Sequence, residues 1–333
     1  LSPETAGEID GGAGPPGPGK SPLPWRARLL LGAVSTLHAA SLRSDGTVSR
    51  FLLSLFDPTV PPTQGPVAGV ASSDHAVSDQ FRVRLFAPKT DDDNGRKELP
   101  VIVYFHGGGF VFHSAESAQY DALCRRLASA VPAFVASVDY RLAPENRFLA
   151  PYDDGEAALR WVLAGGGGAL PSPPEAVFVA GDSAGGNLAH HVVARLPTAS
   201  EQRLRDAPFG APERLARLWR AFLAPGATRD HEAANVPAAI RRDADAGRWR
   251  AFPPTLVCVG GWDAHQDRQR AYREALRAAG AEEVRVAEYP DFIHAFHMFE
   301  ELADSKRFLV DVAEFVNRRT EDLKKRAVAN DHH

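Results

Sequence analysis

Short apolar runs alternate with longer amphipathic segments along most of the chain. Four runs are continuous and rich in β-branched residues, as expected of parallel strands that are buried on both faces: VIVYFH (101–106), AFVASV (133–138), AVFVAG (176–181) and TLVCVG (255–260). The segment QFRVRLFAP (80–88) alternates apolar and polar positions and predicts a half-exposed strand. EVRVAEY (283–289) is expected to be the last strand.

Helical patterns separate these strands. They predict helices at 115–130, 154–163, 185–195, 267–279 and 306–326. Strands that alternate with helices indicate a doubly wound α/β fold, with a mostly parallel central sheet flanked by helices. In such a fold, functional loops follow the carboxyl ends of the strands.

The ends of the chain differ from its middle in composition. Residues 1–24 are rich in Gly and Pro and predict a flexible tail, and residues 328–333 are expected to form a second tail. The 333 residues, 44% of them hydrophobic, suffice for one large domain, which we place at 25–327.

Charge and cysteine content exclude several classes of protein. The formal net charge of −4 gives no reason to expect a nucleic acid or an anionic membrane as partner. No stretch approaches the ~20 apolar residues that span a bilayer. Cys124 and Cys258 lie in apolar contexts and are interpreted as buried thiols. We therefore expect a cytoplasmic protein, with the nucleus as a second location.

No cofactor is expected from the motifs. No glycine-rich nucleotide loop lies between a strand and a helix, and His190 and His191 are adjacent rather than four residues apart, as a helical zinc motif requires. The sequence thus predicts neither a nucleotide nor a metal site.

The segment AGDSAGGN (180–187) follows a predicted strand and precedes a predicted helix. It matches the G-x-S-x-G pattern, in which a sharp turn lifts a serine above the sheet and small neighbours let the backbone bend. The start of the next helix also favours negative charge. The pattern and its position leave two interpretations evenly balanced: an ordinary tight turn, or a nucleophile at Ser183.

A second glycine-rich stretch, YFHGGGFVF (104–112), follows the strand at 101–106. Main-chain N–H groups of Gly107, Gly108 and Gly109 could turn into a cavity and stabilise an oxyanion there. The alternative is a flexible glycine turn in solvent, but the apolar residues on both sides of the glycines argue against a solvent-exposed loop. His106 is interpreted as a structural residue of this loop rather than as a base.

An acid and a base follow two further strands. Asp263 comes after the strand at 255–260, and His294 after the strand at 283–289. The chain order Ser183, Asp263, His294 is that of an α/β-hydrolase, in which the histidine takes the serine proton and the carboxylate orients the imidazole. Other candidates stand nearby: Asp267 and Asp291 as acids, His265 and His297 as bases.

Taken together, these motifs resemble the hormone-sensitive-lipase-like α/β-hydrolases, and most closely their plant carboxylesterase members, to which the gibberellin receptors are related. The resemblance runs from about residue 45 to 320 and is carried by DGTVSRF, HGGGFVFHSA, SVDYRLAPENRF, YDDGEAALRWV, GDSAGGNLAHHV, ATRDHEAANV, GGWDAHQDRQRAY and IHAFHMF.

This resemblance implies roles for individual residues. Ser183 would be the nucleophile, Asp263 the acid and His294 the base. The N–H groups of Gly108, Gly109 and Ala184 would form the oxyanion hole, with Gly107 shaping its loop. N-terminal helices would form a lid, which maps onto residues 25–56. Three aromatic residues could line or support the pocket, or equally belong to the core: Phe110, Tyr140 and Phe296.

The same resemblance implies a serine carboxylesterase that acts on small carboxylic esters and needs no obligate protein partner. Gibberellin receptors lack a working base at the histidine position, whereas this chain has His294 there. An active enzyme is therefore favoured over the alternative, a catalytically weak or inactive hormone-binding protein. HAF in place of the commoner HGF is a small departure from the family pattern.

A larger departure follows residue 196. Family members continue there with an apolar strand, whereas this chain continues with PTASEQRLRDAPFG, and Ser183 and Asp263 are only 80 residues apart. We therefore expect one central strand to be missing after residue 196. Such a loss would remove ladder hydrogen bonds and buried apolar area, which makes an inactive paralogue a third hypothesis.

Overall fold

Seven strands carry the fold in the part of the chain that the computed structural model describes, namely residues 36, 38, 40–43, 47–90, 99–195, 218–228, 230–263 and 265–330. Five of them form one sheet in the order β1-β2-β4-β3-β5. Their bounds are β1 Val70–Ala76, β2 Arg82–Pro88, β3 Val101–Phe105, β4 Phe134–Asp139 and β5 Val177–Gly181. The remaining two, β6 Thr255–Gly260 and β7 Val284–Tyr289, pair in parallel with each other.

The centre of the larger sheet is parallel and its outer edge is antiparallel. β3 lies between β4 and β5 and runs parallel to both. β2 is antiparallel to β4 and also to β1. Every strand expected from the apolar runs is present, whereas β1 was not predicted. Its sequence, VASSDHA, is mostly polar and lacks an apolar periodicity.

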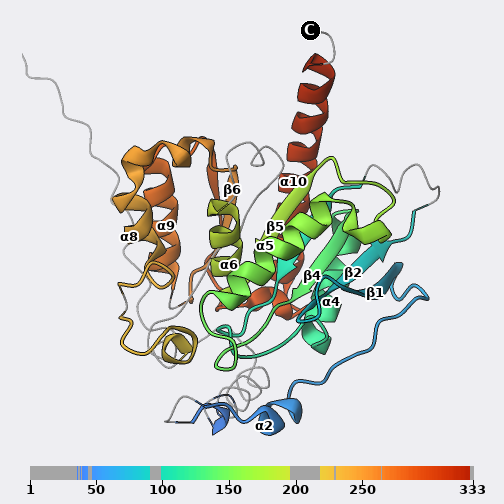
Figure 1. Ribbon diagram of the computed structural model, residues 1–333. Helices are drawn as coiled ribbons and strands as arrows, with labels where there is room; N and C mark the ends of the chain where they lie inside the picture. The colour runs from blue at the N-terminus through green and yellow to red at the C-terminus, as the bar shows by residue number, and fades with distance from the viewer. Residues whose placement is uncertain are drawn as a thin grey trace, which may run out of the picture.

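Helices cover both faces of the larger sheet (Figure 1). α4 (Ala118–Ala130) and α10 (Ala303–Asn330) lie against one face, and the core there contains Ile102, Leu123 and Val316. α5 (Ala150–Leu163) and α6 (Ala184–Ala194) lie against the other, with Leu159 and Leu188 in the core. The α/β fold class is thus confirmed.

The smaller sheet packs against α9 (Gln266–Ala278), which in turn contacts α8 (Val236–Arg242). α8 was not predicted, and α10 is longer at both ends than the helix expected at 306–326. Its C-terminal part extends beyond the rest of the domain in Figure 1. Within the ranges given above, none of the helices combines the length and the hydrophobicity of a transmembrane segment. The shorter helices are α2 (Arg50–Ser54) and 3-10 turns at 166–168, 244–246, 248–251 and 296–298.

The two sheets are not joined by a ladder between β5 and β6 in the described residues. A narrow cavity of about 100 Å³ lies between these strands and α10, and its walls include Val179, Leu256 and Val312. The strand expected to be missing concerns the chain after residue 196, and residues 196–217 lie outside the described part. What the described part shows is a central sheet in two pieces.

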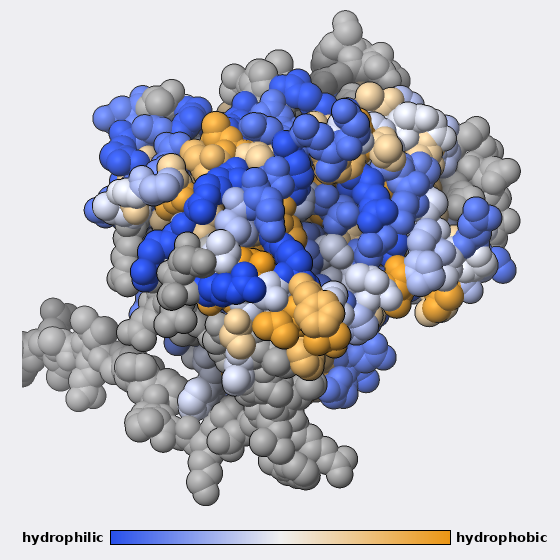
Figure 2. Space-filling view, turned by 60° about the horizontal axis from the view of Figure 1, so that its bottom comes forward, coloured by the Kyte–Doolittle hydropathy of each residue, from blue (hydrophilic) through white to orange (hydrophobic). Residues whose placement is uncertain are grey.

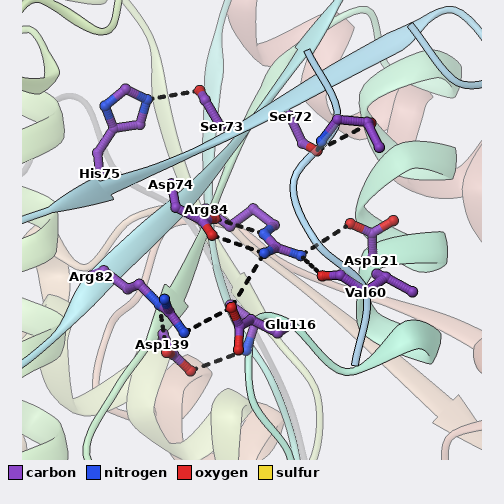
Figure 3. Close-up of polar contacts among 12 residues, drawn as sticks. Val60, Ser72, Ser73, Asp74, His75, Arg82, Arg84, Glu116, Asp121 and Asp139 are labelled. Atoms are coloured by element: carbon purple, nitrogen blue, oxygen red, sulfur yellow. Dashed lines mark hydrogen bonds and ion pairs between the residues drawn. The ribbon is translucent and has the colours of Figure 1, made fainter. Parts of the chain in front are cut away.

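A buried arginine joins the antiparallel edge to the neighbouring helix (Figure 3). The Arg84 side chain is 1% exposed, and its guanidinium donates two hydrogen bonds, of 2.7 and 2.9 Å, to the carboxylate of Asp74. It also donates to the carbonyl of Val60 at 2.7 Å and approaches Asp121 of α4 at 3.5 Å. β1 is therefore held by charge-assisted hydrogen bonds as well as by its ladder, which explains how so polar a segment forms a strand.

Candidate active site

Strand register brings the two glycine-rich loops together. In the parallel pair of β3 and β5, Phe105 lies opposite Gly181, and both are the last residues of their strands. The loop that starts at His106 therefore begins beside Asp182 and Ser183. The N–H of Asp182 donates to the carbonyl of Phe105 at 3.3 Å and ties the two loops at their origin.

The turn between β5 and α6 holds Ser183 in an unusual backbone conformation. Its φ is 54° and its ψ −120°, a region that L residues rarely occupy. A Cβ atom on Gly185 would lie 1.9 Å from the carbonyl oxygen of Phe105, so no larger residue fits there. These close approaches explain the glycines that surround the serine.

Ser183, His294 and Asp263 form a continuous chain of contacts. The Nε2 atom of His294 is 3.2 Å from Ser183 Oγ, and its Nδ1 atom is 2.9 Å from Asp263 Oδ2. Asp267 and Asp291, the other candidate acids, are exposed. The three residues that the sequence placed after three different strands are thus the ones that meet.

Asp263 lies in a polar environment built by its own loop and by α9. Its carboxylate is buried and accepts hydrogen bonds from the backbone N–H of His265 at 2.9 Å and from the side-chain amide of Gln269 at 3.0 Å. Burial raises the pKa of Asp263, but hydrogen bonding and attraction to His294 outweigh it and hold the pKa below its ordinary value. The carboxylate therefore stays ionised beside the imidazole.

Gln269 was not among the predicted site residues. It lies one helical turn inside α9 and donates to the carboxylate of Asp263, a contact that its spacing from Asp263 in the sequence does not indicate.

In the described structure the Ser183 hydroxyl is within hydrogen-bond distance of His294 and makes no hydrogen bond to either of the two remaining candidate bases. His265 is 2% exposed, its Nδ1 atom is 3.7 Å from Asp263 Oδ1, and its ring lies 4.7 Å from that of His294. His297 is also buried, with its ring stacked on Phe308. Burial lowers the pKa of His265 to about 3 and that of His297 to about 4, so both are neutral at pH 7.

A buried polar network supports both loops from below. Tyr104 and Tyr120 donate to the two carboxylate oxygens of Asp182, each at 3.0 Å. The Tyr120 hydroxyl also accepts the N–H of Gly107 at 2.8 Å. Burial raises the pKa of both tyrosines well above the ordinary value, which keeps both hydroxyls protonated as donors. No sequence motif indicated this network, although Asp182 stands inside the serine motif.

The glycine loop presents main-chain donors. Within the described residues, the N–H groups of Gly108, Gly109 and Ala184 donate no hydrogen bond, whereas that of Gly107 is taken by Tyr120. Gly108 and Gly109 have φ values of 109° and 64°. A Cβ atom on Gly109 would lie 2.3 Å from Leu218, so the loop closes tightly against the segment that begins there. Three N–H groups are thus left for a ligand.

The three aromatic candidates are all buried. Phe110 stacks on Phe222 with ring centres 3.9 Å apart. The hydroxyl of Tyr140 donates to the carbonyl of His106 at 2.7 Å. Phe296 packs against Tyr289. Their contacts are those of residues that support the loops of the site.

The N-terminal segment is anchored to the same region. Arg50 of α2 donates to the carbonyls of Val111 and Ala143, the latter at 2.7 Å, and pairs with Glu145. α2 and the residues after it expose large apolar side chains, and Figure 2, which brings the side of α2 forward, shows a hydrophobic patch on this face. The lid expected at 25–56 is described only in part, and its described part is attached to the loop that follows the three glycines.

Comparisons with known proteins agree with this architecture. A family model described as alpha/beta hydrolase fold matches residues 102–205 and 194–298. Gibberellin receptor GID1C of Arabidopsis thaliana is 35% identical over 90% of this chain and 95% of its own length. Probable carboxylesterase 7 of the same plant is 31% identical, over 82% of this chain and 95% of its own.

Solved structures give the same result. EstE1, a thermostable carboxylesterase cloned from a metagenomic library, is 26% identical and superposes with a TM-score of 0.63, over 89% of this chain and 96% of its own. The strand register, the turn at Ser183 and these relatives lead to one conclusion. The chain belongs to the hormone-sensitive-lipase-like α/β-hydrolases, in the branch of plant carboxylesterases related to the gibberellin receptors.

Proposed function

We propose that the protein is a serine carboxylesterase that hydrolyses small carboxylic esters through an acyl-enzyme. The observation that carries this proposal is the chain of contacts from Ser183 Oγ through both nitrogens of His294 to Asp263, at 3.2 and 2.9 Å. A nucleophile, a base and an acid that orients the base are the minimum for acyl transfer by a serine.

In the first half of the reaction, Ser183 Oγ attacks the ester carbonyl carbon while His294 Nε2 accepts the hydroxyl proton. Asp263 holds the Nδ1–H of His294 and stabilises the imidazolium that forms. The N–H groups of Gly108, Gly109 and Ala184 donate to the oxyanion, a kind of stabilisation in which one donor is worth about 2.7–4 kcal/mol. The ester C–O bond then breaks, and the alcohol leaves with the proton from His294.

In the second half, water replaces the alcohol. His294 takes a proton from the water, the hydroxide attacks the acyl carbon, and the bond to Ser183 Oγ breaks as that oxygen regains a proton. The carboxylic acid is released and the enzyme returns to its starting state. No cofactor takes part in these steps.

Similarity to the gibberellin receptors supports a second candidate, a hormone-binding protein without turnover. The 35% identity to GID1C extends over 90% of this chain. Against this candidate stands the intact contact between His294 and Ser183, because binding alone does not require a base at hydrogen-bond distance from a serine.

Hydrolysis of p-nitrophenyl acetate and butyrate by the wild type, Ser183→Ala and Asp263→Asn tests the proposal. We expect kcat to fall by at least a thousandfold in both variants, since removing one member of such a triad costs about 10⁴-fold or more. Circular dichroism and a thermal melt establish that each variant is folded.

Equal rates for wild type and Ser183→Ala would refute the role of Ser183. A wild type that is folded but inactive on both esters would favour the hormone-binding candidate, and titration with a gibberellin then becomes the deciding measurement.

A further inference from the structure

A third side chain joins the acid and the base of the candidate site. Asp263, His265 and His294 each offer one ligand atom, and these three atoms lie within 4.8 Å of one another. They are the only group of three such side chains in the described residues that could hold a metal ion. The mechanism above uses Asp263 and His294 but gives no role to His265.

His265 is buried without a polar partner for its ring. Its side chain is 2% exposed, and neither ring nitrogen makes a hydrogen bond in the described structure. A buried imidazole that leaves its N–H and its lone pair unsatisfied lowers stability, because neither group recovers the hydrogen bond that it made to water in the unfolded chain. Its Nδ1 atom lies 3.7 Å from Asp263 Oδ1, too far for a hydrogen bond but on the side of the catalytic pair.

The spacing fits a small divalent ion. Zinc binds imidazole nitrogen and carboxylate oxygen at about 2.0–2.2 Å, so two ligand atoms of a tetrahedral site lie about 3.3 Å apart. The observed separations are 2.9 Å between His294 Nδ1 and Asp263 Oδ2, and 3.7 Å between His265 Nδ1 and Asp263 Oδ1. One ligand atom from each of the three residues lies within 4.8 Å of the other two, so rotations of the rings and of the carboxylate would bring three atoms around one ion.

We propose that Asp263, His265 and His294 form an inhibitory site for Zn²⁺. Two histidines and one carboxylate are a ligand set that zinc commonly takes. The metal binds His294 through Nδ1, so the proton of the neutral ring must sit on Nε2. That nitrogen then faces Ser183 as a donor and cannot accept the serine proton. Zinc and substrate turnover are therefore mutually exclusive, with His265 as the residue that adds the third ligand.

Zinc binding is measured directly, so that the test does not depend on turnover. Isothermal titration with ZnCl₂ compares Ser183→Ala with the double variants Ser183→Ala/His265→Leu and Ser183→Ala/His75→Leu. His75 lies on β1, at the edge of the larger sheet opposite to β5, and serves as the matched histidine control. We expect one zinc site that weakens at least tenfold when His265 is replaced and is unchanged when His75 is replaced. His265→Gln repeats the comparison with a polar side chain, and a thermal melt establishes folding.

Inhibition is the second measurement, and it alone rests on the proposed function. Ester hydrolysis is followed over a ZnCl₂ series in wild type and His265→Leu, each relative to its own rate without zinc, and then after addition of EDTA. We expect zinc to inhibit the wild type reversibly. In His265→Leu, the zinc concentration that gives half-maximal inhibition should be at least tenfold higher.

Equal zinc affinity with and without His265 would refute the proposal that this residue is a zinc ligand. Binding that requires His265, but without inhibition of an active wild type, would overturn its inhibitory role. An inactive wild type that still binds zinc through His265 would count against the esterase and not against the metal site.

Discussion

Backbone strain at Ser183 gives a prediction that separates the catalytic role of this residue from its effect on stability. Its φ of 54° and ψ of −120° lie in a region that glycine adopts freely and in which a residue with a Cβ atom is strained. A residue held in such a region costs about 1–3 kcal/mol of folding free energy. Both Ser183→Ala and Ser183→Gly remove the nucleophile, but only the glycine variant removes the Cβ atom and hence the strain.

The expected difference follows from two opposing effects. Relief of strain favours the glycine variant by about 1–3 kcal/mol, and the greater freedom of glycine in the unfolded chain opposes it by about 0.5–1 kcal/mol. Ser183→Gly is therefore expected to unfold with a free energy about 1 kcal/mol higher than Ser183→Ala. Urea denaturation followed by circular dichroism measures this difference, with equal slopes required in both variants.

A matched substitution in an ordinary helix serves as the control. Ala157 lies within α5, where Ala→Gly costs about 1 kcal/mol. Glycine in place of alanine should thus raise the free energy of unfolding at position 183 and lower it at position 157. If Ser183→Gly is as stable as Ser183→Ala or less stable, the turn does not hold backbone strain of this size.

Two further predictions concern buried charge. Arg84→Met should lower the free energy of unfolding by about 3–5 kcal/mol, because it leaves the carboxylate of Asp74 without its buried partner. Arg82→Met is the control: this arginine is 42% exposed, so its loss should cost at most about 1 kcal/mol. Similar urea midpoints for the two variants would contradict this prediction. Burial, together with the nearby Arg195, lowers the pKa of His191 to about 3, so the unfolded chain takes up a proton there below about pH 6.5 and the folded chain does not. The free energy of unfolding should therefore decrease as the pH is lowered from about 6.5 to 3. His191→Phe keeps an aromatic ring stacked on Tyr152 and should reduce this decrease by about 1.4 kcal/mol per pH unit. Urea denaturation at pH 7, 6 and 5 measures the dependence, and the same dependence in wild type and variant would refute the prediction.

Local pattern was enough to predict most of the elements and the order of the candidate site. Continuous apolar runs predicted β3, β4, β5 and β6, because a strand buried on both faces must be apolar throughout. Apolar–polar alternation predicted β2, and β7 was expected as the last strand. The glycines around Ser183 indicated the turn, since only small residues allow that close approach to Phe105. Ser183, Asp263 and His294 were identified by their places after three strands.

Tertiary structure decided what no local pattern carries. β1 forms because β2 supplies its ladder and Arg84 its countercharge, both from outside the segment. Asp263 rather than Asp267 or Asp291 reaches His294, because the fold buries the first beside the imidazole and leaves the other two exposed.

The support of the site is also tertiary. Tyr104 and Tyr120 come from β3 and α4, yet both donate to Asp182 after β5, because the parallel register of β3 and β5 brings their ends together. His265 was a candidate base in the sequence, and only the tertiary structure places it beside Asp263 and His294 with no hydrogen bond to its ring. The sequence determined which residues can react, and the packing of distant segments determined which of them meet.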